Sequence, residues 1–204
     1  MCQFIESIKL MDGKLFLLEL HQQRMNRIFD SFYPFEPKID LSQLLHSENF
    51  PLEGFYKCRI VFDTKLRSIE FLPYKIPEIN TLKIVEIDLP AVFYKSADRE
   101  KINEAYKLRA NCDDILMIRN NLITDSSYCN IAVFDGEKWL SPKTPLIYGV
   151  QRMELLRKQK ISEKDIRIDS IYSYQSICLF NAMIEFGEIV FNTTNIGSTR
   201  ICVG

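Results

Sequence analysis

The stretch TDSSYCNIAVF, residues 124–134, carries one acidic side chain, Asp125, next to two apolar runs. The run Ile115 to Ile118 comes before it, and the run Asn130 to Phe134 forms its second half. The second run ends in Asp135-Gly136, a dipeptide typical of the tight turn in a β-hairpin. The pattern therefore predicts two strands joined by a short segment of small residues that holds Asp125. On spacing alone, a solvated carboxylate is commoner at such a position than one held against a cation.

Five other short motifs flank this stretch. In chain order they are DGK (residues 12–14), LHQQRM (20–25), YKSADR (94–99), LSP (140–142) and GVQRMELL (149–156). In this order and at about these separations, the set resembles the pyridoxal-phosphate enzymes of the class IV aminotransferase family. That family includes branched-chain aminotransferase, D-amino-acid aminotransferase and 4-amino-4-deoxychorismate lyase. The resemblance covers nearly the whole chain, and the ordered set makes it specific.

The bulk composition is that of an ordinary globular protein. The chain has 204 residues, with 47% hydrophobic and 26% charged residues. Its formal net charge of −1 provides no field that would attract nucleic acid or an anionic membrane. No apolar run is long enough to span a bilayer, and the N-terminus lacks the pattern of a signal peptide. We therefore expect a cytoplasmic protein with no nucleic-acid or membrane partner.

The cysteines and histidines do not indicate a metal site. None of the six cysteines forms a CxxC pair, and the chain has two histidines. We expect reduced thiols and no zinc site.

The periodicity of apolar residues predicts alternating hairpins and helices. Strands are expected at Phe4–Lys9, Leu15–Leu18, Tyr56–Asp63, Ser68–Pro73, Leu82–Asp88, Ile115–Ile118, Leu122–Ile123, Asn130–Phe134 and Lys138–Leu140. Helices are expected at Glu19–Phe32, Asp40–His46, Arg99–Asn111 and from Gly149 to about Lys160. Short strands or turns are expected at residues 166–170, 176–181, 184–186 and 188–191. This mixture indicates an α+β protein and not a doubly wound parallel sheet.

The proline-bearing connector Pro73 to Pro77 predicts a domain boundary near residue 79. The resemblance implies the two-domain, D-amino-acid-aminotransferase-like fold of fold-type IV enzymes. A small N-terminal α/β domain would span residues 1–79, and a larger C-terminal pseudo-barrel domain would span residues 80–204. Family members usually have an additional strand and loop before the segment that matches Phe4 to Lys9, so this chain has a short N-terminus.

Lys95 is the lysine that suits the attachment of pyridoxal phosphate. It follows the apolar segment Leu89 to Tyr94 and precedes a predicted helix. An amine beside apolar and cationic groups can have a lowered pKa, which suits Schiff-base chemistry. Because lysine is rarely buried, the residue alone favours a solvated side chain. The resemblance instead implies the Schiff-base lysine, because family members carry it just before a helix, often with Asn-Arg shortly after. This chain has Asp98-Arg99 there.

The resemblance implies that Asp125 pairs with the pyridine nitrogen of the cofactor. The family pattern is Thr or Ser followed by Glu, several small residues and then Asn. This chain has Thr124-Asp125 and Asn130, so the acid is one methylene shorter. Such a carboxylate reaches the nitrogen if the backbone shifts or if a water molecule bridges the gap.

The resemblance assigns the cofactor phosphate to three places. Arg24 is one, because a guanidinium suits bidentate phosphate contact; a solvated helical Arg is the alternative. The backbone at Gly149, Val150 and Gln151 is the second, because N–H groups at a helix start bind anions; a plain glycine before a helix is the alternative. Asn181 is the third, with a buried, satisfied amide as the alternative.

Arg59 is the candidate for the substrate carboxylate, with a surface strand arginine as the competing interpretation. The implied function is a pyridoxal-phosphate enzyme, either 4-amino-4-deoxychorismate lyase or an aminotransferase of the branched-chain or D-amino-acid type. The small size of the chain favours the lyase. A catalytically degenerate relative that only binds a ligand is the third possibility. The family generally dimerises, so a homodimer is expected.

Overall fold

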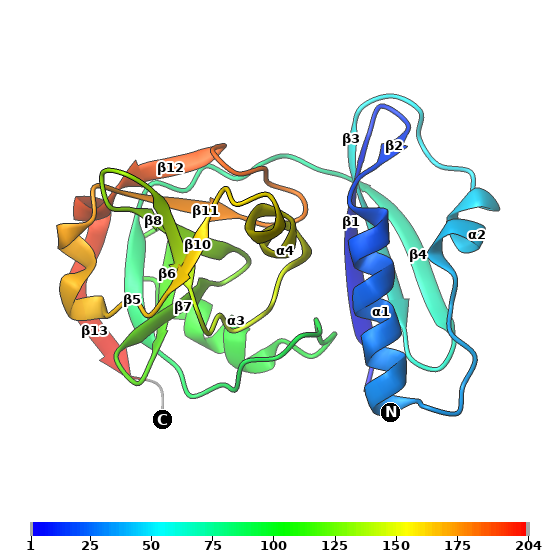
Figure 1. Ribbon diagram of the computed structural model, residues 1–204, viewed down its shortest axis with the longest axis horizontal. Helices are drawn as coiled ribbons and strands as arrows, with labels where there is room; N and C mark the ends of the chain where they lie inside the picture. Colours follow the sequence, from blue (N-terminus) through cyan, green and yellow to red (C-terminus); the bar gives the residue numbers. More distant parts are fainter. Residues whose placement is uncertain (1, 203–204) are drawn as a thin grey trace. The chain divides into compact units, whose positions relative to one another are not determined.

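The computed structural model describes residues 2–202, and these divide into two compact units (Figure 1). The first unit runs to Ile76 and also contains Phe93–Asp98. The second contains Pro77–Val92 and the chain from Arg99 onward. The domain division near residue 79 stays a prediction. In the structure the segment that holds Lys95 packs with the first unit.

The first unit is a four-stranded antiparallel sheet with two helices on one face. The strand order is β2-β1-β3-β4, and the strands are β1 (Phe4–Met11), β2 (Lys14–Leu15), β3 (Phe55–Phe62) and β4 (Leu66–Pro73). The helices are α1 (Leu18–Phe32) and α2 (Leu41–His46). The predicted turn at Asp12-Gly13 joins β1 to β2, with φ of 47° and 74° at these two residues. Both lie in the left-handed region that a tight hairpin of this kind needs.

The two faces of β1 have different roles because side chains alternate along a strand. Phe4 and Ile8 point into the core beneath the helices, and Glu6 bonds to α1. Ser7 and Lys9 point to the opposite face of the sheet. Residues 95–97 extend the β1 edge of the sheet, through a hydrogen bond of 2.8 Å from the Ile5 N–H to the Lys95 carbonyl and one of 2.9 Å from the Ala97 N–H to the Gln3 carbonyl.

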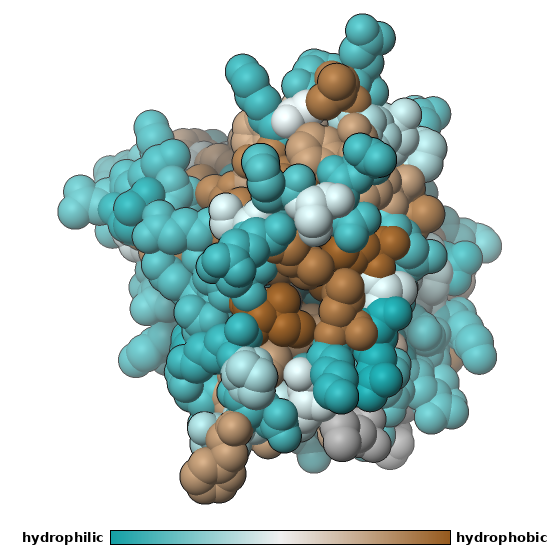
Figure 2. Space-filling model, turned by 90° about the vertical axis from the view of Figure 1, so that its right-hand side faces the viewer, coloured by the Kyte–Doolittle hydropathy of each residue, from teal (hydrophilic) through white to brown (hydrophobic). Residues whose placement is uncertain are grey.

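The surface of the first unit carries apolar side chains. Figure 2 shows them gathered on one face and surrounded by hydrophilic residues. Phe35 is 98% exposed and Leu52 is 73% exposed.

The second unit is built on a nine-stranded mixed sheet with two helices. The main path is β10-β9-β8-β7-β6-β5-β13, and β11 pairs with both β8 and β12. The strands are β5 (Leu82–Glu86), β6 (Asp114–Arg119), β7 (Leu122–Ser126), β8 (Asn130–Phe134), β9 (Trp139–Pro142), β10 (Ser162–Lys164), β11 (Ser176–Phe180), β12 (Ile189–Asn192) and β13 (Ile196–Cys202). The helices are α3 (Glu100–Lys107) and α4 (Val150–Arg157), with 3-10 turns at Ile168–Ser173 and Thr193–Asn195. Ala105 of α3 and Leu155 of α4 belong to two separate buried clusters of this unit.

Several predicted elements are wrong in extent or type. The strand predicted at Leu122–Ile123 runs to Ser126, so Asp125 lies within β7, where it pairs with Asn130 of β8, and not on a segment between strands.

The strand predicted at Leu15–Leu18 ends at Leu15. The Phe16 N–H still bonds the Lys9 carbonyl, but Leu17 adopts φ 55° and α1 begins at Leu18. The helix predicted to reach Asn111 ends at Lys107, and Ala110 has φ 53°. Of the strand or turn predicted at residues 166–170, residues 168–170 begin a 3-10 helix that runs from Ile168 to Ser173, and the Ser170 hydroxyl donates to the Arg167 carbonyl.

No helix within residues 2–202 is long and apolar enough to cross a membrane.

Candidate functional site

Lys95 is fixed through its backbone and its side chain to strand β1. Its carbonyl accepts from the Ile5 N–H, and its Nζ lies 3.2 Å from the Ser7 Oγ as a hydrogen-bond donor. Because Ile5 and Ser7 alternate with Glu6 along β1, the Lys95 side chain lies on the sheet face away from α1. The partly buried amine is thus held in one place, which supports the choice of Lys95 as the reactive lysine.

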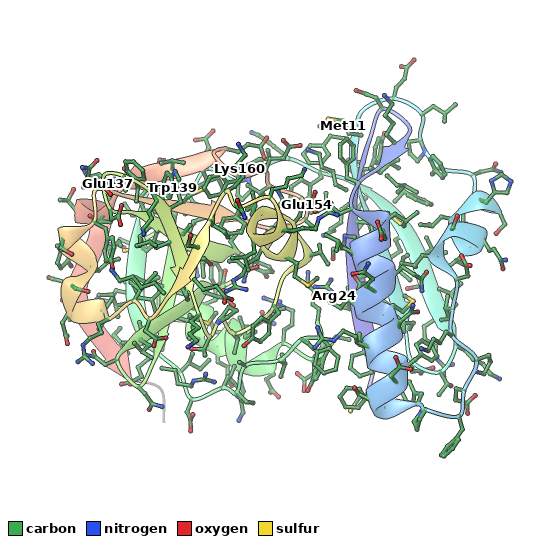
Figure 3. The ribbon with its side chains drawn as sticks, in the orientation of Figure 1. Met11, Arg24, Glu137, Trp139, Glu154 and Lys160 are labelled. Atoms are coloured by element: carbon green, nitrogen blue, oxygen red, sulfur yellow. The ribbon has the colours of Figure 1, made fainter. Side chains whose placement is uncertain are left out.

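Arg24, labelled in Figure 3, lies on the buried side of α1. It contacts the acid Glu6, which was not among the predicted site residues. His21 and Arg24 share the buried side of α1 with Met25, at the helical spacing of three and four residues. The Arg24 Nε donates to Glu6 Oε1 at 2.8 Å, and Nη2 donates to Glu6 Oε2 at 2.6 Å. This side-on pair does not use Nη1, which is directed away from the carboxylate.

His21 completes the cluster on the same carboxylate. Its Nδ1 lies 2.5 Å from Glu6 Oε2, and both side chains are fully buried. Burial lowers the pKa of His21, and the nearby charges of Arg24 and Lys95 lower it further. The imidazole is therefore neutral at pH 7, with the proton on Nδ1 next to the carboxylate. Its buried Nε2 has no hydrogen-bond partner among the described residues.

The carboxylate of Glu6 stays ionised. Burial alone would raise its pKa, but the Arg24 charge and the His21 hydrogen bond outweigh burial and lower the pKa to about 2. The result is a preformed cationic position: Arg24 is held in a single rotamer by two charge-assisted hydrogen bonds.

Asp125 is the acidic residue of the second unit's candidate site. Its Oδ1 accepts from the Asn130 Nδ2 and its Oδ2 accepts from the Ile147 N–H, both at 2.8 Å. These donors are neutral, and burial raises the Asp125 pKa to about 7. A buried carboxylate held by neutral donors is suited to a cationic partner.

Gly149 is needed because Asn130 approaches it closely. A Cβ at position 149 would lie 2.1 Å from the Asn130 Oδ1. Asn130 also donates to the Ile147 carbonyl at 2.8 Å, so one amide joins Asp125 to the loop before α4. Gly149 precedes α4 as its N-cap, and no side chain caps the N-terminus of this helix within residues 2–202. The first N–H groups of α4, at Val150 and Gln151, are therefore available in the way that an anion site requires.

Asn181 is engaged by the protein on both sides of its amide. The Nδ2 donates to the Tyr128 carbonyl at 3.1 Å, and the Oδ1 accepts from the Met183 N–H at 2.7 Å and the Ile184 N–H at 3.0 Å. These bonds match the predicted alternative, a satisfied amide. Its role in phosphate binding stays a prediction.

Arg59 already has an anionic partner. Its Nη1 donates to Glu70 Oε2 at 2.8 Å on the exposed part of β3 and β4. Arg59 is also the direct cross-strand partner of Ser7, so its side chain shares the sheet face on which Lys95 lies. Binding of a substrate carboxylate by Arg59 stays a prediction, and it requires competition with Glu70.

The structure thus collects the predicted residues into two groups, one in each unit. Lys95, Arg24 and Arg59 belong to the first unit, and Asp125, Gly149, Val150, Gln151 and Asn181 belong to the second. Glu6 and Ser7 were not among the predicted site residues. A signal for Glu6 was present, because alternation along the predicted strand places this acid between the apolar residues Phe4 and Ile8 on one face.

Proteins similar to this chain include some that are named as putative aminodeoxychorismate lyases or aminotransferases. No family model matches the chain. An uncharacterized protein of Haemophilus influenzae is 30% identical over 186 residues, which cover 90% of this chain and 98% of that protein. A Schizosaccharomyces pombe protein named "Putative aminodeoxychorismate lyase" is 26% identical over 198 residues, covering 85% of this chain and 83% of that protein.

Two solved structures have folds similar to that of this chain. A putative 4-amino-4-deoxychorismate lyase from Haemophilus somnus is 29% identical with a TM-score of 0.84, covering 90% of this chain and 97% of that chain. A putative branched-chain amino acid aminotransferase from Thermotoga maritima is 15% identical with a TM-score of 0.71, covering 91% of this chain and 74% of that chain. With the mixed α+β architecture and the ordered motifs, these similarities show that the chain belongs to the class IV aminotransferase family and has the fold of fold-type IV enzymes.

Proposed function

We propose that the chain is a pyridoxal-phosphate-dependent 4-amino-4-deoxychorismate lyase, which converts its substrate to 4-aminobenzoate and pyruvate for folate synthesis. The observation that carries the proposal is the fixed position of Lys95: its carbonyl accepts from the Ile5 N–H of β1, and its Nζ donates to the Ser7 hydroxyl. The similar proteins from Haemophilus somnus and Schizosaccharomyces pombe are both named as putative aminodeoxychorismate lyases. They support the lyase reaction over the other reactions of the family.

The side chains fit the demands of the cofactor. Pyridoxal phosphate needs an amine for attachment, a cation for its phosphate and a carboxylate for its ring nitrogen. Lys95 provides the amine, Arg24 provides a fixed guanidinium whose Nη1 is not used by Glu6, and Asp125 provides a buried carboxylate without a charged hydrogen-bond partner. The buried Nε2 of His21, which has no hydrogen-bond partner within residues 2–202, is a further polar atom suited to a bound group.

We assign the roles as follows. Lys95 attaches the cofactor, and Asp125 pairs with the ring nitrogen. The phosphate is held by Arg24, by the N–H groups at Gly149, Val150 and Gln151, and by Asn181. When bound, the cofactor supplies an electron sink for the charge that develops on the substrate carbon.

Lys95 also moves the proton in the reaction. Once its amine is released from the cofactor, it removes the proton from the ring carbon that bears the substrate amino group. The electrons of that bond form the new ring double bond, the adjacent C–O bond breaks, and the three-carbon group leaves with the C–O electrons as the enolate of pyruvate, which takes up a proton to give pyruvate. The ring becomes aromatic, which makes the elimination favourable. Arg59 is the proposed contact for a substrate carboxylate.

An aminotransferase is the second candidate, and structural neighbours with aminotransferase names favour it. Both reactions begin with removal of the proton from the carbon that bears the amino group. They differ in the next step: in the lyase the group on the adjacent carbon leaves, and in the aminotransferase it stays. A protein that binds the cofactor without turnover is the third candidate, favoured by the shorter acid Asp125.

The test is release of pyruvate and 4-aminobenzoate from aminodeoxychorismate by the cofactor-loaded protein. We expect turnover by the wild type and a loss of about 1,000-fold or more in Lys95→Ala. Lys101→Ala, an exposed lysine of α3, is the matched control and should keep full activity. Amino transfer to a 2-oxo acid without pyruvate release would favour the aminotransferase, and neither activity would favour the binding protein.

We further propose that the chain works in the cytoplasm as a homodimer. The exposed Phe35 and Leu52 and the apolar face in Figure 2 are consistent with association. Light scattering after gel filtration would check this, with a dimer mass as the expected result and a monomer mass as the contrary one.

A further inference from the structure

Arg99 binds the turn that joins β7 to β8 in the second unit. Its Nη2 donates to the Ser127 carbonyl at 2.6 Å, and its Cζ lies 4.4 Å from the centroid of the Tyr128 ring. Arg99 is also the N-cap residue of α3, and its own carbonyl accepts from the Asn103 N–H at 2.8 Å. The side chain therefore joins the start of a helix to a turn that lies 28 residues later in the chain.

The turn connects the acid Asp125 to its partner on the next strand. Asp125 of β7 lies directly across from Asn130 of β8, whose amide donates to the carboxylate at 2.8 Å. Between them, the Ser126 N–H donates to the Cys129 carbonyl at 2.9 Å, and the Cys129 N–H donates to the Ser126 Oγ at 3.1 Å. Within residues 2–202, the register of β7 with β8 consists of this one cross-strand pair. The position of Asp125 therefore depends on the order of the turn.

Asn181 binds the same turn at the neighbouring carbonyl. Its Nδ2 donates to the Tyr128 carbonyl at 3.1 Å, and the preceding carbonyl in the chain is the one that Arg99 holds. Carbonyl groups in a tight turn have no partner in the strand ladder, so side-chain donors are needed to fix them. Arg99 and Asn181 supply these donors, which orders the turn before a ligand binds.

The bond from Arg99 to the turn comes from a charged donor. Burial lowers the pKa of Arg99, and the interactions with Tyr128 and Asp114 raise it. The guanidinium stays charged, because its ordinary pKa lies far above 7. Asp114, which is 2% exposed at the start of β6, supplies an opposite charge. Since charged donors form stronger hydrogen bonds than neutral ones, Arg99 restrains the turn more than a neutral side chain would.

We propose that Arg99 is a positioning residue that fixes Asp125 for its contact with the ring nitrogen of the cofactor. The inference rests on the proposed function, in which Asp125 has that role. Arg99 acts through the turn, which in turn sets the pairing of Asp125 with Asn130. Asp125 is one methylene shorter than the acid of the family pattern, so its reach depends closely on the backbone. A displacement of about 1 Å is enough to weaken a contact of this kind.

The experiment is titration of the cofactor-free protein with pyridoxal phosphate, followed by the visible absorbance of the bound cofactor. Arg99→Met should bind at least about fivefold more weakly than the wild type, because part of the binding energy is then spent on ordering the turn. Asp125→Asn and the double variant Arg99→Met/Asp125→Asn should differ by less than about twofold, because the effect of Arg99 passes through Asp125. A contribution of Arg99 to stability alone would instead give the same loss in both backgrounds.

Arg109→Met is the matched control. Arg109 donates to the Tyr106 carbonyl at 3.2 Å, and its Cζ lies 4.2 Å from the centroid of the Tyr106 ring. It makes the same two kinds of contact as Arg99, but with α3 and not with the turn, so its variant should bind within about twofold of the wild type. Arg99→Lys keeps a charged donor and should recover the affinity to within about threefold of the wild type. Arg99→Gln, which is neutral and shorter, is the second variant if Arg99→Met does not fold, and the same fivefold loss or more (about 1 kcal/mol) is expected of it.

Equal affinity of the wild type and the Arg99→Met or Arg99→Gln variant would overturn the role of Arg99. So would an equal loss in the wild-type and Asp125→Asn backgrounds. A wild type that binds no pyridoxal phosphate would overturn the proposed function and this inference together. Wild-type binding that is independent of Arg99 would leave the proposed function in place and remove only the positioning role.

Discussion

Arg24 donates to both carboxylate oxygens of Glu6, from Nε at 2.8 Å and from Nη2 at 2.6 Å, and both side chains are buried. Helix α1 and strand β1 are thereby joined by an ion pair that also receives the His21 ring. Such a pair orients Arg24 before any ligand arrives, so less entropy is lost when an anion binds.

Replacing Glu6 by Gln should destabilise the protein by about 3 kcal/mol, because it leaves a buried guanidinium without its counter-charge. Chemical denaturation measures the free energy of unfolding. Glu19→Gln, at an exposed position in the first turn of α1, is the control and should change it by less than about 0.5 kcal/mol. Equal stability of Glu6→Gln and wild type would contradict the role of the pair.

The low pKa of Glu6 predicts that the protein loses stability in acid. The folded pKa of Glu6 is about 2, below its ordinary value of 4.5, so its contribution to stability is complete above pH 4.5 and falls away as the pH drops toward 2. Unfolding free energies measured across this range should fall more steeply for the wild type than for Glu6→Gln. Parallel curves would show that Glu6 does not titrate as described.

The raised pKa of Asp125 predicts that the stability of the cofactor-free protein depends on pH in the opposite direction. Burial raises its folded pKa to about 7 from an ordinary 3.8, so the folded state holds a proton that the unfolded state has lost. Stability should therefore decline from pH 4 to pH 7, by on the order of 4 kcal/mol at most, and then level off. Asp125→Asn should flatten this decline.

Bound cofactor should change the Asp125 behaviour. A protonated ring nitrogen beside Asp125 would favour its ionised form, so the decline between pH 4 and 7 should shrink in the loaded protein. An unchanged decline would mean that Asp125 does not pair with the ring.

Gly149→Ala should disrupt the contact between α4 and Asn130. The new Cβ would lie 2.1 Å from Asn130 Oδ1, and moving that side chain breaks its bonds to Asp125 and to the Ile147 carbonyl. We expect a loss of about 2 kcal/mol or more in thermal or chemical unfolding. Gly197→Ala is the matched control, because its Cβ would have an ordinary contact of 3.6 Å with the Leu82 carbonyl oxygen. Equal stability of the two variants would contradict the close approach.

The hairpins and helices of this fold were predictable because their signals are local. Asp12-Gly13 supplies the left-handed turn between β1 and β2, and the spacing of Met25, Ile28 and Phe29 marks the buried side of α1. Strand β13 was not predicted. It pairs in parallel with β5, which lies more than a hundred residues earlier, and its polar middle shows no apolar alternation.

The candidate site was predictable only in part, because some of its contacts join residues that are far apart in the sequence. Lys95 and Asp125 stand in motifs that can be recognised along the chain. The contact of Lys95 with Ser7 joins residues 88 positions apart through an added edge of a sheet, and no local pattern encodes it. The pair of Glu6 with Arg24 needed the relative rotation of β1 and α1, which only the packed core determines.

The most direct measurement of the central claim is borohydride reduction of the protein with pyridoxal phosphate, followed by peptide mapping. The fixed amine of Lys95 predicts a visible absorbance band that borohydride bleaches, one label per chain, and that label on Lys95. Lys95→Ala should lose both the band and the label, whereas Lys101→Ala should keep them. A label on another lysine, or none in the wild type, would contradict the assignment of Lys95 and with it the proposed enzyme.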